Sequence, residues 1–168
     1  MRERRVVAGS AAVIEPMTMF RVRPLIASDL TAWRPLWDGY NAFYGRSGPT
    51  ALPEEVTRTT WTRLLDEAEP VHGLVAEDGA ALVGLAHFLF HRSTTMIGPT
   101  CYLQDLFTDE RARGQGVASA LIAAVSAAAK GHGATRLYWH THASNARARR
   151  VYDRLAEDSG FIVYRMGT

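Results

Sequence analysis

The sequence predicts a single mixed α/β domain in which helices flank a central sheet. Apolar runs rich in β-branched and aromatic residues alternate with segments whose apolar residues recur at helical spacing. Two of these runs are separated by Asp78 and Gly79, a pair typical of a tight hairpin. Another run, 102–108, leads through a glycine-rich loop into an alanine-rich helix. Strands that alternate with helices around a hairpin indicate a mixed sheet covered by helices.

Length and composition fit one domain in a reducing compartment. A chain of 168 residues can bury roughly 70% of the surface that it exposes when unfolded. The single cysteine, Cys101, rules out an internal disulfide and a multi-cysteine metal site. We therefore expect Cys101 to be a small core residue and the protein to be cytoplasmic. No apolar run approaches the roughly 20 residues of a membrane span. The net charge of +2 is too close to balance to indicate nucleic acid.

The first third of the chain is expected to contain one strand and two helices. We interpret residues 1–18 as a flexible extension without periodic pattern, and residues 19–168 as the domain. A strand runs from Met19 to Leu25, one helix covers Leu30 to Tyr44, and a second helix runs from about Pro53 through Leu65. Large apolar residues recur along the first helix and could form the core or wall a substrate pocket: Trp33, Leu36, Trp37, Tyr40, Phe43 and Tyr44.

The rest of the chain is expected to contain five strands and two helices. Lys130 and Gly131 suit the end of the first of these helices. Ser144 and Asn145 are candidate caps for the second. The expected strands cover residues 73–77, 81–91, 102–108, 135–141 and 161–165, and the helices run from 115 to 130 and from the caps to about 158.

A glycine-rich loop, residues 113–118, opens the alanine-rich helix. Glycines let the backbone approach a ligand closely, and a helix start offers unpaired N–H groups to an anion such as a pyrophosphate. The loop is not a P-loop, because Val117 and Ala118 stand where Lys and Ser or Thr are required. Nor is it a dinucleotide loop, because Ser119 replaces the third glycine. A turn that merely joins strand to helix is the simpler alternative.

The loop and three longer segments resemble the GNAT family of N-acetyltransferases. Arg113, Gly116 and Ala118 match its Arg/Gln-x-x-Gly-x-Gly/Ala pyrophosphate motif. Its subgroup of polyamine and small histone acetyltransferases is resembled by the segments YLQDLFT, RGQGVASALI and LYWHTHASNARARRVYDRLAEDSGF. The resemblance extends from Phe20 to Met166. It implies the GNAT fold and direct transfer of acetyl to the primary amine of a small molecule.

The resemblance also implies an acetyl-CoA site without a metal. The backbone of Leu106, Phe107 and Thr108 would bind the pantetheine arm and the thioester carbonyl. Asn145 and Tyr152 would contact the cofactor from the last helix. The pyrophosphate would be held by the loop residues Arg113, Gly114, Gln115, Gly116, Val117, Ala118 and Ser119.

Three residues are the candidates for catalysis. Tyr152 aligns with the family's tyrosine that protonates the leaving thiolate, and a phenol with a pKa of about 10 keeps its proton at neutral pH. The alternative for Tyr152 is a core aromatic. An ammonium must lose a proton before it attacks, so a base must face the acceptor. Asp105, beside the proposed thioester site, is the first candidate base, and His140, at a base position used elsewhere in the family, is the second.

Other features leave several alternatives open. His87, His91 and His142 are expected to be ordinary polar residues, because no metal-ligand spacing joins them. Gln104 stands where polyamine acetyltransferases carry a second acid, which argues against a polycationic substrate. The family implies a homodimer formed through C-terminal strands. Alternative functions are acetylation of a protein N-terminus or lysine, a non-catalytic CoA-binding module, and nucleic-acid binding through Arg147, Arg149, Arg150 and Arg154.

Overall fold

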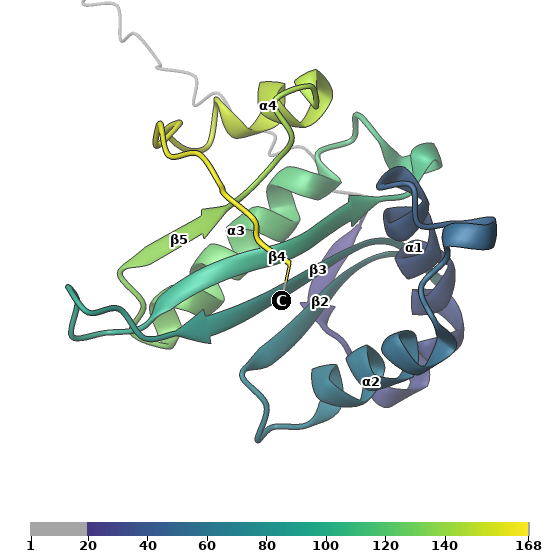
Figure 1. Cartoon of the computed structure of the whole chain (residues 1–168). Coiled ribbons are helices and arrows are strands. Elements are labelled where there is room, and N and C mark those ends of the chain that lie inside the picture. The colour runs from purple at the N-terminus through teal and green to yellow at the C-terminus, as the bar shows by residue number, and fades with distance from the viewer. Residues whose placement is uncertain (1–19, 168) are drawn as a thin grey trace, which may run out of the picture.

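The computed structural model describes residues 20–167, which form a five-stranded sheet with helices on both faces (Figure 1). The strand order is β1-β2-β3-β4-β5, and neighbours are antiparallel except for the parallel pair β4 and β5. The predicted mixed α/β class is therefore confirmed. The strands are β1 (Arg21–Pro24), β2 (Val71–Asp78), β3 (Ala81–His91), β4 (Thr100–Thr108) and β5 (Arg136–Trp139), and the longer helices are α1 (Leu30–Phe43), α2 (Glu54–Leu65), α3 (Val117–Gly131) and α4 (Ala146–Tyr152).

Two hydrophobic clusters lie on opposite faces of the sheet. Helices α1 and α2 cover one face and α3 covers the other (Figure 1). Successive strand residues alternate between them, so that Val75 packs with α1 while Leu74 and Ala76 pack with α3. The predicted stripe on α1 is core over most of its length. Trp33, Leu36, Trp37 and Tyr40 are buried, whereas Phe43 and Tyr44 at its end are exposed.

A bulge interrupts the pairing of β3 with β4. His87 pairs with Asp105, but the next residue, Phe88, pairs with Leu103. Gln104 therefore has no partner in β3 and forms the extra residue of β4. A bulge bends its strand and increases the local twist, and this one lies where β4 leaves the side of β5.

The outer half of β4 has no neighbour on the β5 side. β5 pairs with β4 only over Thr100–Leu103, and the last pair joins Leu103 to Trp139. From Gln104 to Thr108 the described residues place no strand on that edge. About every second backbone N–H and C=O of this stretch then points into the opening, because antiparallel pairing uses only alternate residues on each side.

The C-terminal part differs from the prediction. α4 ends at Tyr152, six residues before the expected Asp158, where Leu155 N–H and Ala156 N–H both donate to the Tyr152 carbonyl. The expected strand 161–165 is wrong, because the segment pairs with no strand in the described chain and its side chains are exposed. A strand needs a partner for its backbone groups. Figure 1 shows this yellow segment crossing in front of β4. The extension predicted at residues 1–18 lies outside the described residues.

Candidate active site

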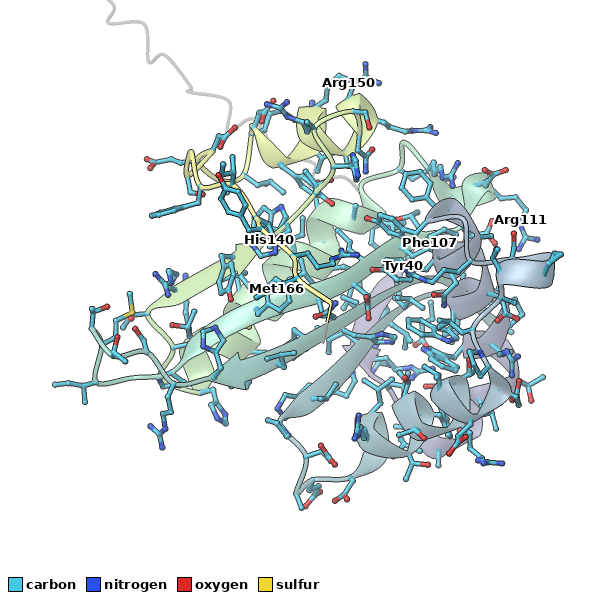
Figure 2. All side chains as sticks on the ribbon, viewed as in Figure 1. Tyr40, Phe107, Arg111, His140, Arg150 and Met166 are labelled. Atoms are coloured by element: carbon cyan, nitrogen blue, oxygen red, sulfur yellow. The ribbon has the colours of Figure 1, made fainter. Side chains whose placement is uncertain are left out.

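A small hollow lies at the opening between β4 and β5. Its cavity volume is about 20 Å³. Side chains from α1, β4, the end of β5 and α4 surround it, and Figure 2 labels two of these residues, Tyr40 on α1 and His140 just after β5. Three residues predicted from the sequence, Leu106, His140 and Tyr152, meet here. The complete lining is Tyr40, Tyr44, Leu103, Gln104, Leu106, Trp139, His140 and Tyr152.

Tyr152 is held at the last turn of α4 by packing on β5. Its ring meets that of Trp139 edge to face, with the ring centroids 5.3 Å apart. Burial, followed by repulsion from the nearby Tyr44 phenol when both are ionised, raises the pKa of Tyr152 to about 12. The phenol therefore keeps its proton throughout the neutral range. It can act as a hydrogen-bond donor or as an acid toward a strongly basic leaving atom.

Asp105 belongs to a buried chain of hydrogen bonds. Its side chain is joined to Nδ1 of His87 at 3.0 Å, and Trp33 Nε1 donates to Nε2 of His87 at 3.1 Å. Trp33 can only donate, so Nε2 must accept and the proton of the neutral ring sits on Nδ1, from which it is donated to Asp105. His87 is 1% exposed and Asp105 is 8% exposed. These hydrogen bonds thus fix both the tautomer of His87 and the direction of the Asp105 carboxylate.

The negative charge of Asp105 acts on the tyrosines of the hollow. Burial is the larger cause of the raised pKa of Tyr40 and Tyr44, and the Asp105 charge adds to it in both. Asp105 thus lies beside the residues that line the hollow. Tyr44 in turn contributes to the raised pKa of Tyr152. The candidate base Asp105 and the candidate acid Tyr152 therefore share Tyr44 as a neighbour.

His87 and Trp33 were not predicted as site residues. We expected His87 to be an ordinary polar residue, but it is one of the most deeply buried side chains and bonds directly to Asp105. Only the β3–β4 register, in which His87 and Asp105 are paired, could have revealed this contact. A polar residue inside an apolar strand such as ALVGLAHFLFH is a weak sign of such a buried network.

His140 is exposed at the end of β5. Its Nδ1 is hydrogen-bonded to the Tyr102 hydroxyl at 3.2 Å, and its ring lies 5.3 Å from the Tyr102 ring. It lines the hollow, but it belongs to a half-exposed surface cluster rather than to the buried chain of Asp105. The two candidate bases therefore differ in burial.

The glycine loop has the backbone of an anion site. Gly114 and Gly116 have φ angles of 80° and 87°, values that strongly favour glycine. The N–H groups of Val117, Ala118 and Ser119 belong to the first turn of α3, where no helical acceptor precedes them. The helix begins without a side-chain cap, so no side chain takes up these donors.

Gly84 on β3 lets the start of α3 approach the sheet closely. A Cβ at Gly84 would lie 2.8 Å from Val117 Cγ1 and 3.0 Å from the Phe107 carbonyl oxygen. The glycine loop is thereby held beside the outer end of β4. Arg113 anchors the same loop, because its Nε donates to the Thr108 carbonyl and its Nη1 to Glu110.

Two further residues bear on a cofactor site. The buried Thr108 hydroxyl at the end of β4 finds no hydrogen-bond partner within residues 20–167. Asn145 caps α4, since its Oδ1 accepts from the Ala148 N–H at 3.3 Å and its Nδ2 lies 3.4 Å from the Thr141 hydroxyl. An unpaired hydroxyl and an open strand edge beside free helix-start N–H groups fit a long polar cofactor arm that ends in a pyrophosphate.

A larger hollow lies elsewhere, between α1 and α2. Its cavity volume is about 460 Å³ and none of the predicted site residues line it. Arg34 at its rim is already paired with Asp38 and Glu54. Within residues 20–167 there is no group of three or more His, Cys, Asp or Glu side chains placed to hold a metal ion. Nor does that part of the chain contain a helix long and apolar enough to cross a membrane.

Comparison with known proteins agrees with this geometry. Residues 33–156 match the acetyltransferase (GNAT) family. The D-amino-acid N-acetyltransferase HPA3 of Saccharomyces cerevisiae is 33% identical over 147 residues, which cover 86% of this chain and 88% of that protein. The uncharacterized N-acetyltransferase YhfO of Bacillus subtilis is 28% identical over 145 residues, covering 85% and 94%.

A solved structure shows the same fold at lower identity. AAC(6')-Iy in complex with the bisubstrate analog CoA-S-monomethyl-acetylneamine superposes with a TM-score of 0.76 at 19% identity, over 89% of this chain and 98% of that one. The family match spans most of the described sheet and includes residues of both helices that border the hollow, α1 and α4. The chain therefore belongs to the acetyltransferase (GNAT) family of acetyl-CoA-dependent acyltransferases.

Proposed function

We propose that this protein transfers acetyl from acetyl-CoA directly to the primary amine of a small molecule. The observation that carries the proposal is the hollow at the open edge of β4, where the protonated Tyr152 and the buried Asp105 have Tyr44 as a common neighbour. The names of two similar proteins, a D-amino-acid acetyltransferase and the enzyme AAC(6')-Iy with its neamine-derived ligand, support a small amine as acceptor.

Acetyl-CoA would lie along the outer half of β4 and across the glycine loop. Backbone groups of Leu106 and Phe107 and the unpaired Thr108 hydroxyl are available for its pantetheine arm. The N–H groups of Gly114 to Ser119 would bind the pyrophosphate. Asn145 would contact the cofactor in addition to capping α4. When bound, the thioester supplies an activated acetyl group.

The protein's residues would move two protons. Asp105, directly or through water, would take a proton from the acceptor ammonium, so that the amine's lone pair becomes nucleophilic. A backbone N–H near Leu106 would stabilise the negative charge that develops on the carbonyl oxygen. Tyr152 would donate its phenolic proton to the departing sulfur.

The burial of Cys101 supports direct transfer without an acetylated enzyme. Its thiol is 0% exposed, and burial raises its pKa to about 11. A cysteine nucleophile must become a thiolate and reach the substrate, and Cys101 meets neither condition. We expect a Cys101→Ala variant to retain turnover, and loss of turnover in a folded variant would argue for a covalent route.

The assignment of the base to Asp105 can be tested against His140. We expect Asp105→Asn to remove the acidic limb of the pH profile of kcat/KM, whereas His140→Ala should preserve it. Asp105 is favoured because His87 orients it beside the hollow, while His140 faces solvent. If only the His140 variant alters the acidic limb, the roles must be exchanged, and if neither does, both assignments fail.

An acceptor screen tests the whole proposal. Free thiol released from acetyl-CoA would be measured with amino acids, polyamines, aminoglycosides and basic peptides, with Tyr152→Phe as the control. We expect release with at least one small amine and a large decrease in the control. Release only with peptides would identify a protein acetyltransferase. Thermal stabilisation by CoA without release would identify a binding module.

Nucleic-acid binding is the less favoured alternative. The arginines of α4 point mainly into solvent, as Figure 2 shows for Arg150. Arg149 Nη2 lies 3.6 Å from Asp158 Oδ2. This arrangement is common on solvated helix faces. Salt-sensitive DNA binding together with absent thermal stabilisation by CoA would favour that function and contradict ours.

We also infer that the protein is cytoplasmic and that it forms a homodimer through its C-terminal segment. Phe161 to Tyr164 are between 63% and 91% exposed, and β5 ends the sheet with an open edge. Such apolar groups and strand edges favour pairing with another chain. Light scattering should give twice the chain mass, and truncation after Gly160 should give monomers. A monomeric full chain would contradict the dimer, and recovery of the protein outside the cytoplasmic fraction would contradict the location.

A further inference from the structure

We propose that the acceptor is a zwitterion, a free amino acid, whose carboxylate is bound by Arg46 while its amine faces Asp105. The inference rests on the proposed acetyl transfer and names the substrate class of the same site. It depends on a fixed guanidinium that has no acidic partner within residues 20–167 and that lies over two tyrosines of the hollow.

Arg46 is fixed by the end of α1. Its backbone N–H donates to the Asn41 carbonyl at 2.9 Å, and its Nε donates to Asn41 Oδ1 at 2.7 Å. Asn41 is 4% exposed and is itself held by a bond from its Nδ2 to the Trp37 carbonyl. The guanidinium is thus oriented before any ligand arrives, which lowers the entropy lost on binding.

The guanidinium lies over the tyrosines that line the hollow. Its Cζ is 5.7 Å from the centre of the Tyr40 ring and 5.4 Å from that of Tyr44. Both rings belong to the hollow that Tyr152 also lines. A ligand that enters beside these rings would therefore meet the free edge of Arg46.

Arg46 forms no salt bridge within residues 20–167, although other arginines of the same helical layer do. Arg34 on α1 pairs with both Asp38 and Glu54. The terminal nitrogens of Arg46 remain free for a planar anion, and a guanidinium binds a carboxylate through two parallel hydrogen bonds.

Opposite charges act on the two tyrosines that line the hollow. After burial, which is the main cause, the Asp105 charge raises the pKa of Tyr40 and Tyr44, whereas the Arg46 charge lowers it. An acceptor with one ammonium and one carboxylate matches this pair of charges. A polyamine would bring a second ammonium toward Arg46, and the neutral Gln104 offers it no compensating charge.

Matched acceptor pairs test this inference. Thiol release would be compared for phenylalanine and phenethylamine and for alanine and ethylamine, with both enantiomers of each amino acid. For at least one pair the wild-type protein should prefer the amino acid by about 100-fold in kcat/KM, the effect of truncating one member of a close charge pair. Arg46→Gln should remove most of this preference by lowering kcat/KM about 100-fold for the amino acid and far less for the amine.

Control variants separate charge recognition from folding. Arg58→Gln removes an exposed arginine on α2, outside the small hollow, and should leave the preference unchanged. Arg46→Lys keeps the charge without the planar fork and should restore part of the preference. Stabilisation by CoA should be equal in all variants, which shows that each is folded.

Two results would overturn the inference in distinguishable ways. Equal release with amines and amino acids, or an equal loss for both in Arg46→Gln, would remove the carboxylate site and leave acetyl transfer intact. No thiol release with any acceptor would instead remove the proposed function, and the inference with it.

Discussion

Asp105 and Tyr152 approach the same hollow from two regions that are built very differently. Asp105 lies on a nine-residue strand and is paired there with His87 of β3, and both His87 and the Trp33 that donates to it are almost completely buried. Tyr152 lies on a seven-residue helix that follows a four-residue edge strand, and no residue of that helix is fully buried. The base candidate is part of the core, whereas the acid candidate is attached at the edge.

This difference separates stability from activity. A change near Asp105 disturbs buried hydrogen bonds and should lower both stability and activity, because an unpaired buried polar group destabilises the folded state. A change at Tyr152 removes one hydroxyl from a half-buried ring and should cost activity alone. The predictions below test that separation.

The largest expected effect is on turnover in Tyr152→Phe. Loss of a general acid should lower kcat about 10²- to 10⁴-fold, while the ring keeps its packing on Trp139 and the melting temperature stays nearly constant. Steady-state kinetics and calorimetry measure the two quantities. Unchanged turnover would remove Tyr152 from the mechanism.

A second effect, on stability, is expected in the core region for His87→Phe. The Trp33 N–H and the Asp105 carboxylate would both lose their buried partner. The free energy of unfolding should fall by about 2–3 kcal/mol, and kcat should fall with it. His142→Phe is the control, because His142 is exposed. Equal denaturation midpoints for the two variants would contradict the claim that this region is structural as well as functional.

A smaller effect is expected from uncapping α4 with Asn145→Ala. Loss of an N-cap costs about 1 kcal/mol of helix stability, and α4 contributes little to the core, so global unfolding should change less than local opening. Hydrogen exchange of the Ala148 amide should report the change. Ser144→Ala is the control, since its side chain does not cap the helix. Full protection of that amide in the Asn145 variant would contradict the edge description.

The effect that is expected to be smallest at neutral pH is the one on alkaline stability. The pKa of Tyr152 is raised from its ordinary value of 10.0 to about 12, so the folded state holds this proton more tightly than the unfolded state. Its contribution is complete below pH about 10 and is lost as the pH rises toward about 12. Tyr152→Phe should therefore show a shallower decrease of stability over this interval. An unchanged slope would mean that the ring is not desolvated.

Much of the fold could be predicted from the sequence because local patterns determine it. The hairpin at Asp78 and Gly79, the strands before residue 140 and the glycine loop are short-range signals, and each is found close to where it is expected. Leu106, His140 and Tyr152 could be brought together only through the family resemblance, because they come from three separate elements.

The remaining features depend on long-range geometry. The contact of His87 with Asp105 follows from a strand register that includes the bulge at Gln104. Arg46 becomes a candidate binding residue only because its guanidinium lies over Tyr40 and Tyr44 beside the hollow. The strand expected at 161–165 has the right composition, but the segment pairs with no strand in the described chain. Composition alone does not supply a partner.

A crystal structure of the protein with coenzyme A would test the central claim most directly. The account predicts that the diphosphate lies against the N–H groups of Gly114 to Ser119, that the pantetheine arm follows β4 past Leu106, and that the sulfur lies within hydrogen-bond reach of the Tyr152 hydroxyl. A diphosphate bound elsewhere, or a Tyr152 side chain turned away from the sulfur, would contradict it.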